Sequence, residues 1–100
     1  MEKDADRWLR EHPSVEVTLP DRPEGDWRDQ TGYGWIAKFW FRSLRDARTA
    51  KTEIDREGWM PGSFGRKIRV SVTDGRDGQK LVEFVLERWP DVRRIQLRCD

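Results

Sequence analysis

Four segments of the chain alternate between apolar and polar residues, and this period of two is the feature that most restricts the fold. In residues 66–73, for example, Ile68, Val70 and Val72 alternate with polar side chains, and residues 14–19, 33–42 and 92–99 follow the same rule. Successive side chains of a β-strand point to opposite faces of a sheet, so each segment is expected to be a strand. Because only one face of each strand is apolar, we expect helices to cover one side of the sheet.

Three other segments have the spacing of amphipathic helices. They cover residues 2–12, the stretch between Ser43 and Gly58, and residues 79–89. Ser43 is expected to cap the second helix, with Asp46 three residues later, and Asp77 is expected to cap the third. The predicted order of elements is therefore α-β-β-α-β-α-β.

This order predicts an α/β protein, more closely an α+β two-layer sandwich, in one domain that covers residues 1–100. We expect a four-stranded mixed sheet with its helices on one face. Both strand–helix–strand units are expected to be right-handed crossovers that give parallel pairs. A ferredoxin-like architecture is the nearest common arrangement, although two strands precede the first covering helix and its strict βαββαβ order is not matched.

Two irregular segments interrupt the pattern. Residues 20–32 contain two Pro, two Gly and no periodicity, which predicts a long mobile loop. Residues 59–65 (WMPGSFG) are expected to be a turn-rich connection rather than a strand.

Composition excludes several classes of protein. The net charge of +1 excludes a globally basic nucleic-acid-binding arm, and a mean hydropathy of -0.97 with 39% charged residues argues against a membrane span. Cys99 is the single cysteine, so neither an intramolecular disulfide nor a cysteine-based zinc site is expected. The polar start of the sequence shows no signal peptide, and we expect a cytoplasmic protein.

The charge is unevenly distributed along the chain. Residues 1–30 have a net charge of -4 and residues 66–98 a net charge of +4. The outward positions of the four expected strands bring together six basic residues and one acidic residue, Glu16. The candidate binding residues on this basic sheet face are Lys38, Trp40, Arg42, Lys67, Arg69, Arg94 and Arg98.

Cations beside an aromatic ring are typical of surfaces that bind single-stranded nucleic acid or another polyanion. An uncovered sheet face must also be polar simply to stay in water, and long basic side chains can lie over a sheet for that reason alone. The acidic N-terminal segment is a further possible cover for this face. The sequence leaves these interpretations open.

No catalytic or metal-binding residue is predicted, and no cofactor is expected. His12 is the only histidine, so neither a catalytic triad nor a histidine-rich metal site can be assembled. An arginine–carboxylate site has no sequence signature, so an enzyme is not expected but stays open.

Six tryptophans are more than a small core easily takes up. Trp27 and Trp59 fall in irregular segments and are candidate loop contacts, since Trp and Arg dominate the energetics of interfaces. The leading hypothesis is a small non-catalytic interaction or regulatory module that binds a protein partner or a second copy of itself through a Trp/Arg-rich surface. The alternative is single-stranded nucleic-acid or polyanion binding on the basic sheet face. No membrane partner is expected.

Overall fold

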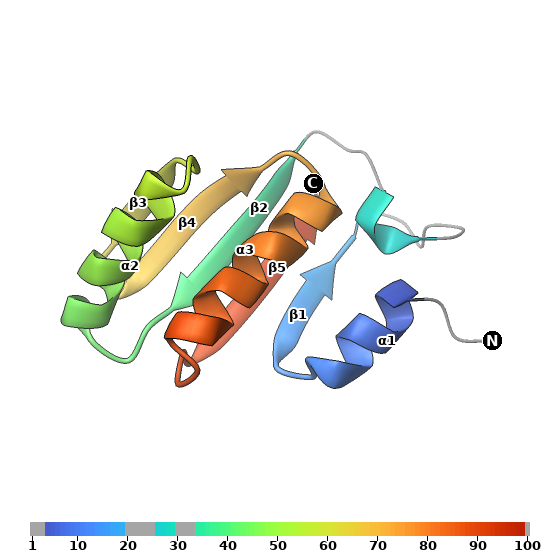
Figure 1. Ribbon diagram of the computed structural model, residues 1–100, viewed down its shortest axis with the longest axis horizontal. Helices are drawn as coiled ribbons and strands as arrows, with labels where there is room; N and C mark the ends of the chain where they lie inside the picture. The colour runs from blue at the N-terminus through green and yellow to red at the C-terminus, as the bar shows by residue number, and fades with distance from the viewer. Residues whose placement is uncertain (1–3, 20–25, 30–33, 100) are drawn as a thin grey trace.

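The computed structural model describes residues 4–19, 26–29 and 34–99, which form one sheet and three α-helices (Figure 1). The elements, in chain order, are α1 (Asp4–Glu11), β1 (Val15–Thr18), the short 3-10 helix η1 (Trp27–Asp29), β2 (Trp35–Trp40), α2 (Leu44–Arg56), β3 (Pro61–Phe64), β4 (Lys67–Val72), α3 (Gly75–Arg88) and β5 (Arg94–Cys99). The four expected strands and three expected helices are all present.

The sheet has five strands rather than the four expected. Its order is β1-β5-β2-β4-β3, with β1 parallel to β5 and every other neighbouring pair antiparallel. The prediction of parallel pairs across α2 and α3 was wrong. The two strands expected on either side of α2, β2 and β4, are antiparallel neighbours, and β3 comes between α2 and β4 in sequence. Across α3, β4 and β5 run in the same direction but are separated by β2.

The additional strand is β3, which lies within the segment expected to be a turn-rich connection. Its sequence, Pro-Gly-Ser-Phe, contains residues that disfavour strand interiors. Because β3 is an edge strand that pairs with β4 only, Pro61 is tolerated there. Gly65 has a φ of 64°, the left-handed conformation that lets the chain turn from β3 into β4.

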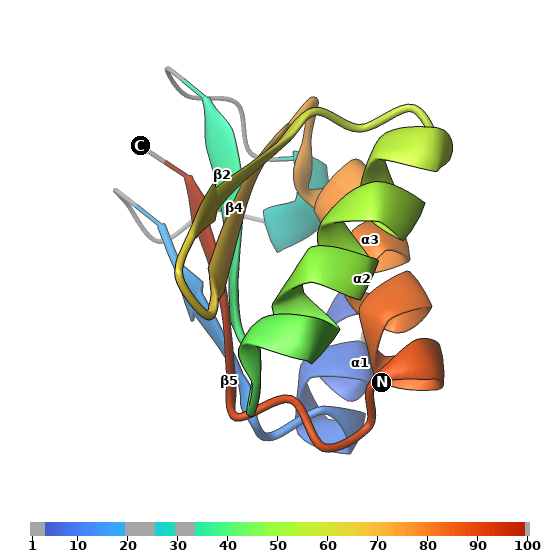
Figure 2. The same cartoon turned by 90° about the vertical axis from the view of Figure 1, so that its left-hand side faces the viewer.

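All three helices cover the same side of the sheet, and no described element covers the opposite side (Figure 2). The alternation in sequence corresponds to this arrangement, since Ile68, Val70 and Val72 are buried beneath the helices, whereas Arg69 and Ser71 are exposed. No helix among the described residues has the length and apolar character needed to cross a bilayer.

The helix α3 begins four residues earlier than expected, and its N-cap is Asp74 rather than Asp77. The Asp74 side chain accepts a hydrogen bond from the main-chain N–H of Asp77 at 2.8 Å, and the Asp77 carboxylate accepts one from Thr73 at 3.1 Å. The first bond is the N-cap bond of a capping box, and the second attaches Asp77 to the residue before the N-cap. By contrast, the prediction that Ser43 caps α2 is confirmed, because its hydroxyl accepts the main-chain N–H of Asp46 at 3.1 Å.

Most of the tryptophans belong to the core. Trp27 in η1 exposes 4% of its surface, and its ring lies between Trp8 of α1 and Trp35 of β2, with centroids 6.0 and 6.1 Å away. Its indole N–H donates to the main-chain carbonyl of Ala5 at 3.2 Å. Trp89 is buried as well. Of the loop expected at 20–32, residues 20–25 and 30–32 lie outside the described residues, and the described part packs on the core through Trp27.

Candidate functional site

The uncovered side of the sheet is the candidate site, and we call it the open face. Its cations come from three adjacent strands: Lys38 from β2, Lys67 and Arg69 from β4, and Arg94 and Arg98 from β5. The strands also place Trp40, Phe64 and Glu16 there. Five cations against one carboxylate give these side chains a net charge of +4 in a protein whose total is +1.

One row across the sheet alternates cations and aromatic rings. Trp40 of β2 is opposite Arg94 of β5 on one side and Lys67 of β4 on the other, and Lys67 is in turn opposite Phe64 of β3. The row therefore contains residues from four strands in the order Arg94, Trp40, Lys67, Phe64. We call it the cation–aromatic row.

Close contacts within the row fix the positions of its charges. The Arg94 guanidinium carbon lies 4.7 Å from the centre of the Trp40 ring, and the Lys67 ammonium lies 5.5 Å from the same ring. Lys67 also lies 5.9 Å from the Phe64 ring. These are distances at which a cation is attracted to the face of an aromatic ring. Phe64 exposes 62% of its surface, and Trp40 is partly exposed.

The second row places two positive charges directly opposite each other. Lys38 of β2 is paired with Arg69 of β4, and its neighbour on the other side is Gln96 of β5. Within the described part of the chain, neither cation forms an ion pair with a carboxylate. Like charges directly opposite on neighbouring strands are destabilising. A bound anion would relieve this repulsion.

The one carboxylate that the described strands place on the open face is already paired. Glu16 of β1 accepts hydrogen bonds from Arg94 at 2.5 and 3.2 Å. The bond from Arg94 lowers the pKa of Glu16, and the same bond raises the pKa of Arg94. Glu16 therefore compensates one cation at the β1 edge, and no carboxylate among the described residues forms an ion pair with the cations of β2 and β4.

Arg42 is held differently from the other predicted residues. It follows the end of β2 and donates from Nε to the main-chain carbonyl of Asp91 at 2.8 Å. Its guanidinium also lies 3.8 Å from the Asp91 carboxylate. Arg42 therefore links the end of β2 to the segment before β5, and the strand rows do not include it.

The two tryptophans named as loop contacts have structural partners. Trp27 is buried, as described above. Trp59 is partly buried, its indole N–H lies 3.3 Å from both carboxylate oxygens of Asp77, and its ring packs edge-on against Phe84. The structure thus brings neither residue to the open face.

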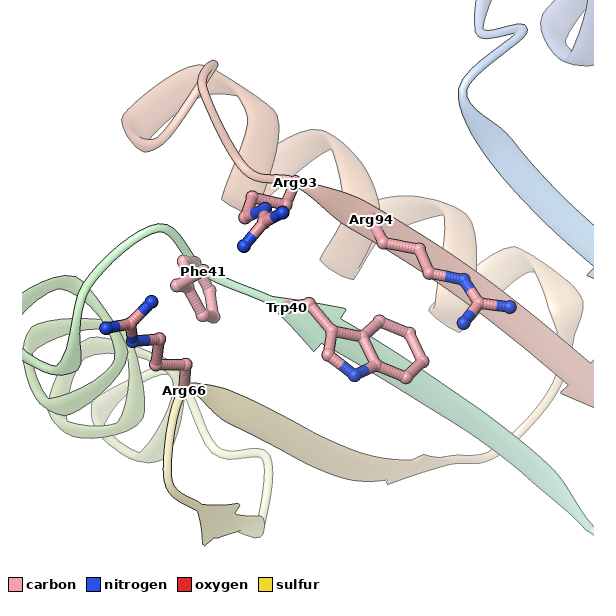
Figure 3. A pocket seen from close by; sticks show the side chains of 5 residues that line it. All are labelled: Trp40, Phe41, Arg66, Arg93 and Arg94. Carbon is pink, nitrogen blue, oxygen red and sulfur yellow. The ribbon is translucent and has the colours of Figure 1, made fainter.

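A hollow of about 370 Å³ adjoins the end of the cation–aromatic row (Figure 3). Trp40 and Arg94 line it together with three residues that the sequence did not single out, Phe41, Arg66 and Arg93. Arg66 and Arg93 lie just before β4 and β5. In the alternating segments 66–73 and 92–99 they occupy inward positions, so a list of outward residues did not include them. The sequence signal for the hollow is the pair of adjacent basic residues at the start of each strand, Arg66-Lys67 and Arg93-Arg94.

His12 and Cys99 have structural roles. His12 stacks on Trp8 with ring centroids 4.3 Å apart, and its Nδ1 lies 2.7 Å from the Trp8 carbonyl oxygen. Cys99 is buried in β5. Among residues 4–19, 26–29 and 34–99, no three His, Cys, Asp or Glu side chains are grouped in a way that would hold a metal ion.

Comparison of the chain with models of protein families, with curated proteins and with solved structures finds no match.

Proposed function

We propose that the open face binds single-stranded nucleic acid. The observation that carries the proposal is the cation–aromatic row, because it alternates rings on which bases stack with cations that contact phosphates. The uncompensated pair Lys38 and Arg69 lies one row further along the same strands and extends the positive surface. A patch formed only of solvated basic side chains would not require exposed rings between them.

The arrangement of the strands supports a more specific fold assignment within this proposal. Leaving out α1 and β1, the chain from β2 to β5 has the order β-α-β-β-α-β and the strand order β5-β2-β4-β3. This order supports a ferredoxin-like architecture to which α1 and β1 are added at the β5 edge. Such a fold hosts many unrelated functions, so the functional proposal rests on the side chains of the open face.

A salt titration tests the proposal. If Lys38, Lys67 and Arg69 each neutralise one phosphate, the logarithm of the association constant falls with the logarithm of salt with a slope of about -2 for a single strand. Fluorescence anisotropy of labelled ten-nucleotide RNA and DNA strands measures this slope. Absence of binding at low salt would refute the proposal.

Two matched double variants locate the binding surface. Arg69→Glu with Arg98→Glu changes two cations of the open face, whereas Arg45→Glu with Arg48→Glu makes the same charge change on exposed positions of α2, on the helical side. We expect the first variant to abolish binding and the second to bind within about threefold of the wild type. Equal losses in both variants would indicate a general charge effect and contradict the proposal.

Replacement of Trp40 separates stacking from charge. Trp40→Ala removes the ring at the centre of the cation–aromatic row and leaves all cations in place. Stacking of one base on an aromatic side chain contributes about 1–3 kcal/mol, which corresponds to a loss of affinity of about 5- to 150-fold. The salt slope should stay unchanged, since no charge is removed.

A second proposal is a protein partner, or a second copy of the chain, at the β3 edge. Met60 and Phe64 expose 85% and 62% of their surfaces beside this edge strand. Four of the six tryptophans are buried, so the argument from tryptophan content supports this proposal less than the sequence suggested. Size-exclusion chromatography with light scattering tests self-association. A dimer that is lost in the double variant Met60→Lys with Phe64→Lys would support this second proposal. A monomer at every concentration would oppose it.

A further inference from the structure

The hollow beside the cation–aromatic row is formed where β2 ends and where β4 and β5 begin. Arg93 donates its main-chain N–H to the Trp40 carbonyl at 2.8 Å, and Phe41 donates its own to the Arg66 carbonyl at 2.9 Å. These two bonds attach the segments before β5 and β4 to opposite sides of the end of β2. They place Arg66 and Arg93 on either side of Phe41, with Trp40 and Arg94 next to them (Figure 3).

The hollow has positive charges that the described protein does not neutralise. Neither the Arg66 nor the Arg93 guanidinium has a hydrogen bond or an ion pair with any residue that the structure describes. The third cation, Arg94, is shared with Glu16. The nearby carboxylate of Asp91 lies beside Arg42 instead.

Two guanidinium groups beside one hollow, those of Arg66 and Arg93, suit an anion with several oxygens. The planar guanidinium matches the geometry of phosphate with two parallel hydrogen bonds, and such charge-assisted bonds are stronger than neutral ones. A phosphate monoester has a charge of about -1.5 to -2 at neutral pH, more than a phosphodiester within a strand. Two uncompensated arginines therefore favour the monoester over an internal phosphate.

The position of the hollow indicates which part of a ligand it receives. Trp40 belongs both to the cation–aromatic row and to the wall of the hollow. A base stacked on Trp40 would place its own phosphate beside the arginines, at the end of the sheet. A volume of about 370 Å³ lies within the range of pockets for small ligands, about 300–1,000 Å³.

From these observations we infer that the hollow binds the terminal phosphate monoester of a single strand whose last base stacks on Trp40. This inference rests on the proposed function and adds to it the class of ligand, a strand with a phosphorylated end. Arg66 and Arg93 bind the terminal phosphate, and the open face binds the rest of the strand.

The test compares strands that differ only at one end. Eight-nucleotide strands labelled at the 3′ end, with a 5′-phosphate or a 5′-hydroxyl, are titrated by fluorescence anisotropy, and strands labelled at the 5′ end test the 3′-phosphate in the same way. We expect one of the two phosphorylated ends to bind about tenfold more tightly than its hydroxyl counterpart. Arg66→Gln with Arg93→Gln should remove this preference and leave the affinity for hydroxyl strands within about threefold.

A matched control uses the second row of the open face. Lys38→Gln with Arg69→Gln removes the same number of charges, so all strands should bind more weakly while the preference for the phosphorylated end remains. Equal affinities for phosphate and hydroxyl ends overturn the inference and leave the proposed function standing. A preference that survives Arg66→Gln with Arg93→Gln also overturns it. If no strand binds at all, the proposed function and the inference both fall.

A last comparison distinguishes the strand end from a free phosphorylated molecule. A nucleoside 5′-monophosphate and inorganic phosphate are used as unlabelled competitors against the phosphorylated strand. We expect the mononucleotide to compete at least about a hundredfold more weakly than the unlabelled strand, because it lacks the contacts of the open face. Competition as strong as that of the strand would overturn the assignment to a strand end and identify a pocket for small phosphorylated molecules.

Discussion

Replacement of Gly75 by alanine tests how η1 is attached to α3. Gly75 is the first residue of α3, and a Cβ atom added there would lie 2.6 Å from Cα and 2.9 Å from the carbonyl oxygen of Arg28. Non-bonded carbon atoms are in favourable contact at about 3.5–4.0 Å, so the Arg28 main chain would have to move by about 1 Å. Because Arg28 follows Trp27, this movement would loosen a buried tryptophan.

The magnitude follows from two opposing effects. Overpacking of this kind costs about 1–3 kcal/mol, and alanine regains at most about 1 kcal/mol over glycine through its helix propensity. The obstacle is backbone, which cannot rotate away as a side chain can. We therefore expect Gly75→Ala to lower the free energy of unfolding by about 2 kcal/mol.

Gly78 in the same helix provides the control. A Cβ atom there would lie 3.0 Å from Cδ2 of Leu97, a side-chain methyl group that can shift by a few tenths of an ångström. The same gain in helix propensity applies, so Gly78→Ala should stay within about 1 kcal/mol of the wild type. Urea unfolding followed by far-UV circular dichroism measures both variants. A Gly75→Ala protein as stable as the wild type would refute the close packing of η1 on α3.

Three further predictions concern stability and reactivity. The hydrogen bond from Arg76 lowers the pKa of Asp29 below its usual 3.8. The stabilisation from this pair is therefore complete above that value and is lost as the pH falls through the lower folded-state pKa. Urea titrations from about pH 7 to about pH 3 should show a loss of stability in acid that Arg76→Gln reduces, and an unchanged loss would contradict this. Trp27→Ala should cost about 3–5 kcal/mol, against less than about 1 kcal/mol for Trp40→Ala, and comparable losses in urea unfolding would argue against a buried Trp27. Cys99 exposes 2% of its surface, so a thiol reagent should react at least about a hundredfold more slowly with the native than with the urea-unfolded protein; similar rates would place the thiol at the surface.

The alternation of residue types was sufficient to predict which face of each long strand is buried. Ile68, Val70 and Val72 face the helices, and Lys67 and Arg69 face away, because a period of two leaves no other arrangement once one side is apolar. The cations of the open face were predictable for the same reason. Their partners across strands were not, since register depends on pairing between segments that are distant in sequence.

Glycine and proline account for two errors in the predicted elements. Pro61 and Gly62 suggested a turn, but an edge strand tolerates both, and β3 forms there. Gly75 and Gly78 precede the helix expected at 79–89, but both lie in α3, where each is close to another segment. Local propensity cannot distinguish a glycine that turns the chain from one that permits close packing.

Arg66 and Arg93 were missed for a different physical reason. Each occupies an inward position at the start of its alternating segment, ahead of the first inward apolar residue, and the two are brought together only by their bonds to the end of β2. Trp27 likewise has no periodic neighbours that would indicate burial. In each case the deciding contact is made by a distant segment.

The parallel pair of β1 and β5 affects how the protein is made. Val15 lies opposite Ile95, so almost the whole chain separates the two strands. A growing chain leaves the ribosome from its N-terminus, and β1 therefore emerges long before the strand that pairs with it. During synthesis the segments from β2 to β4 can already form local antiparallel pairs, whereas β1 has no partner. Closing so long a loop is slow. A chain interrupted before residue 94 would leave β1 without its pairing strand, and unpaired strand edges favour aggregation.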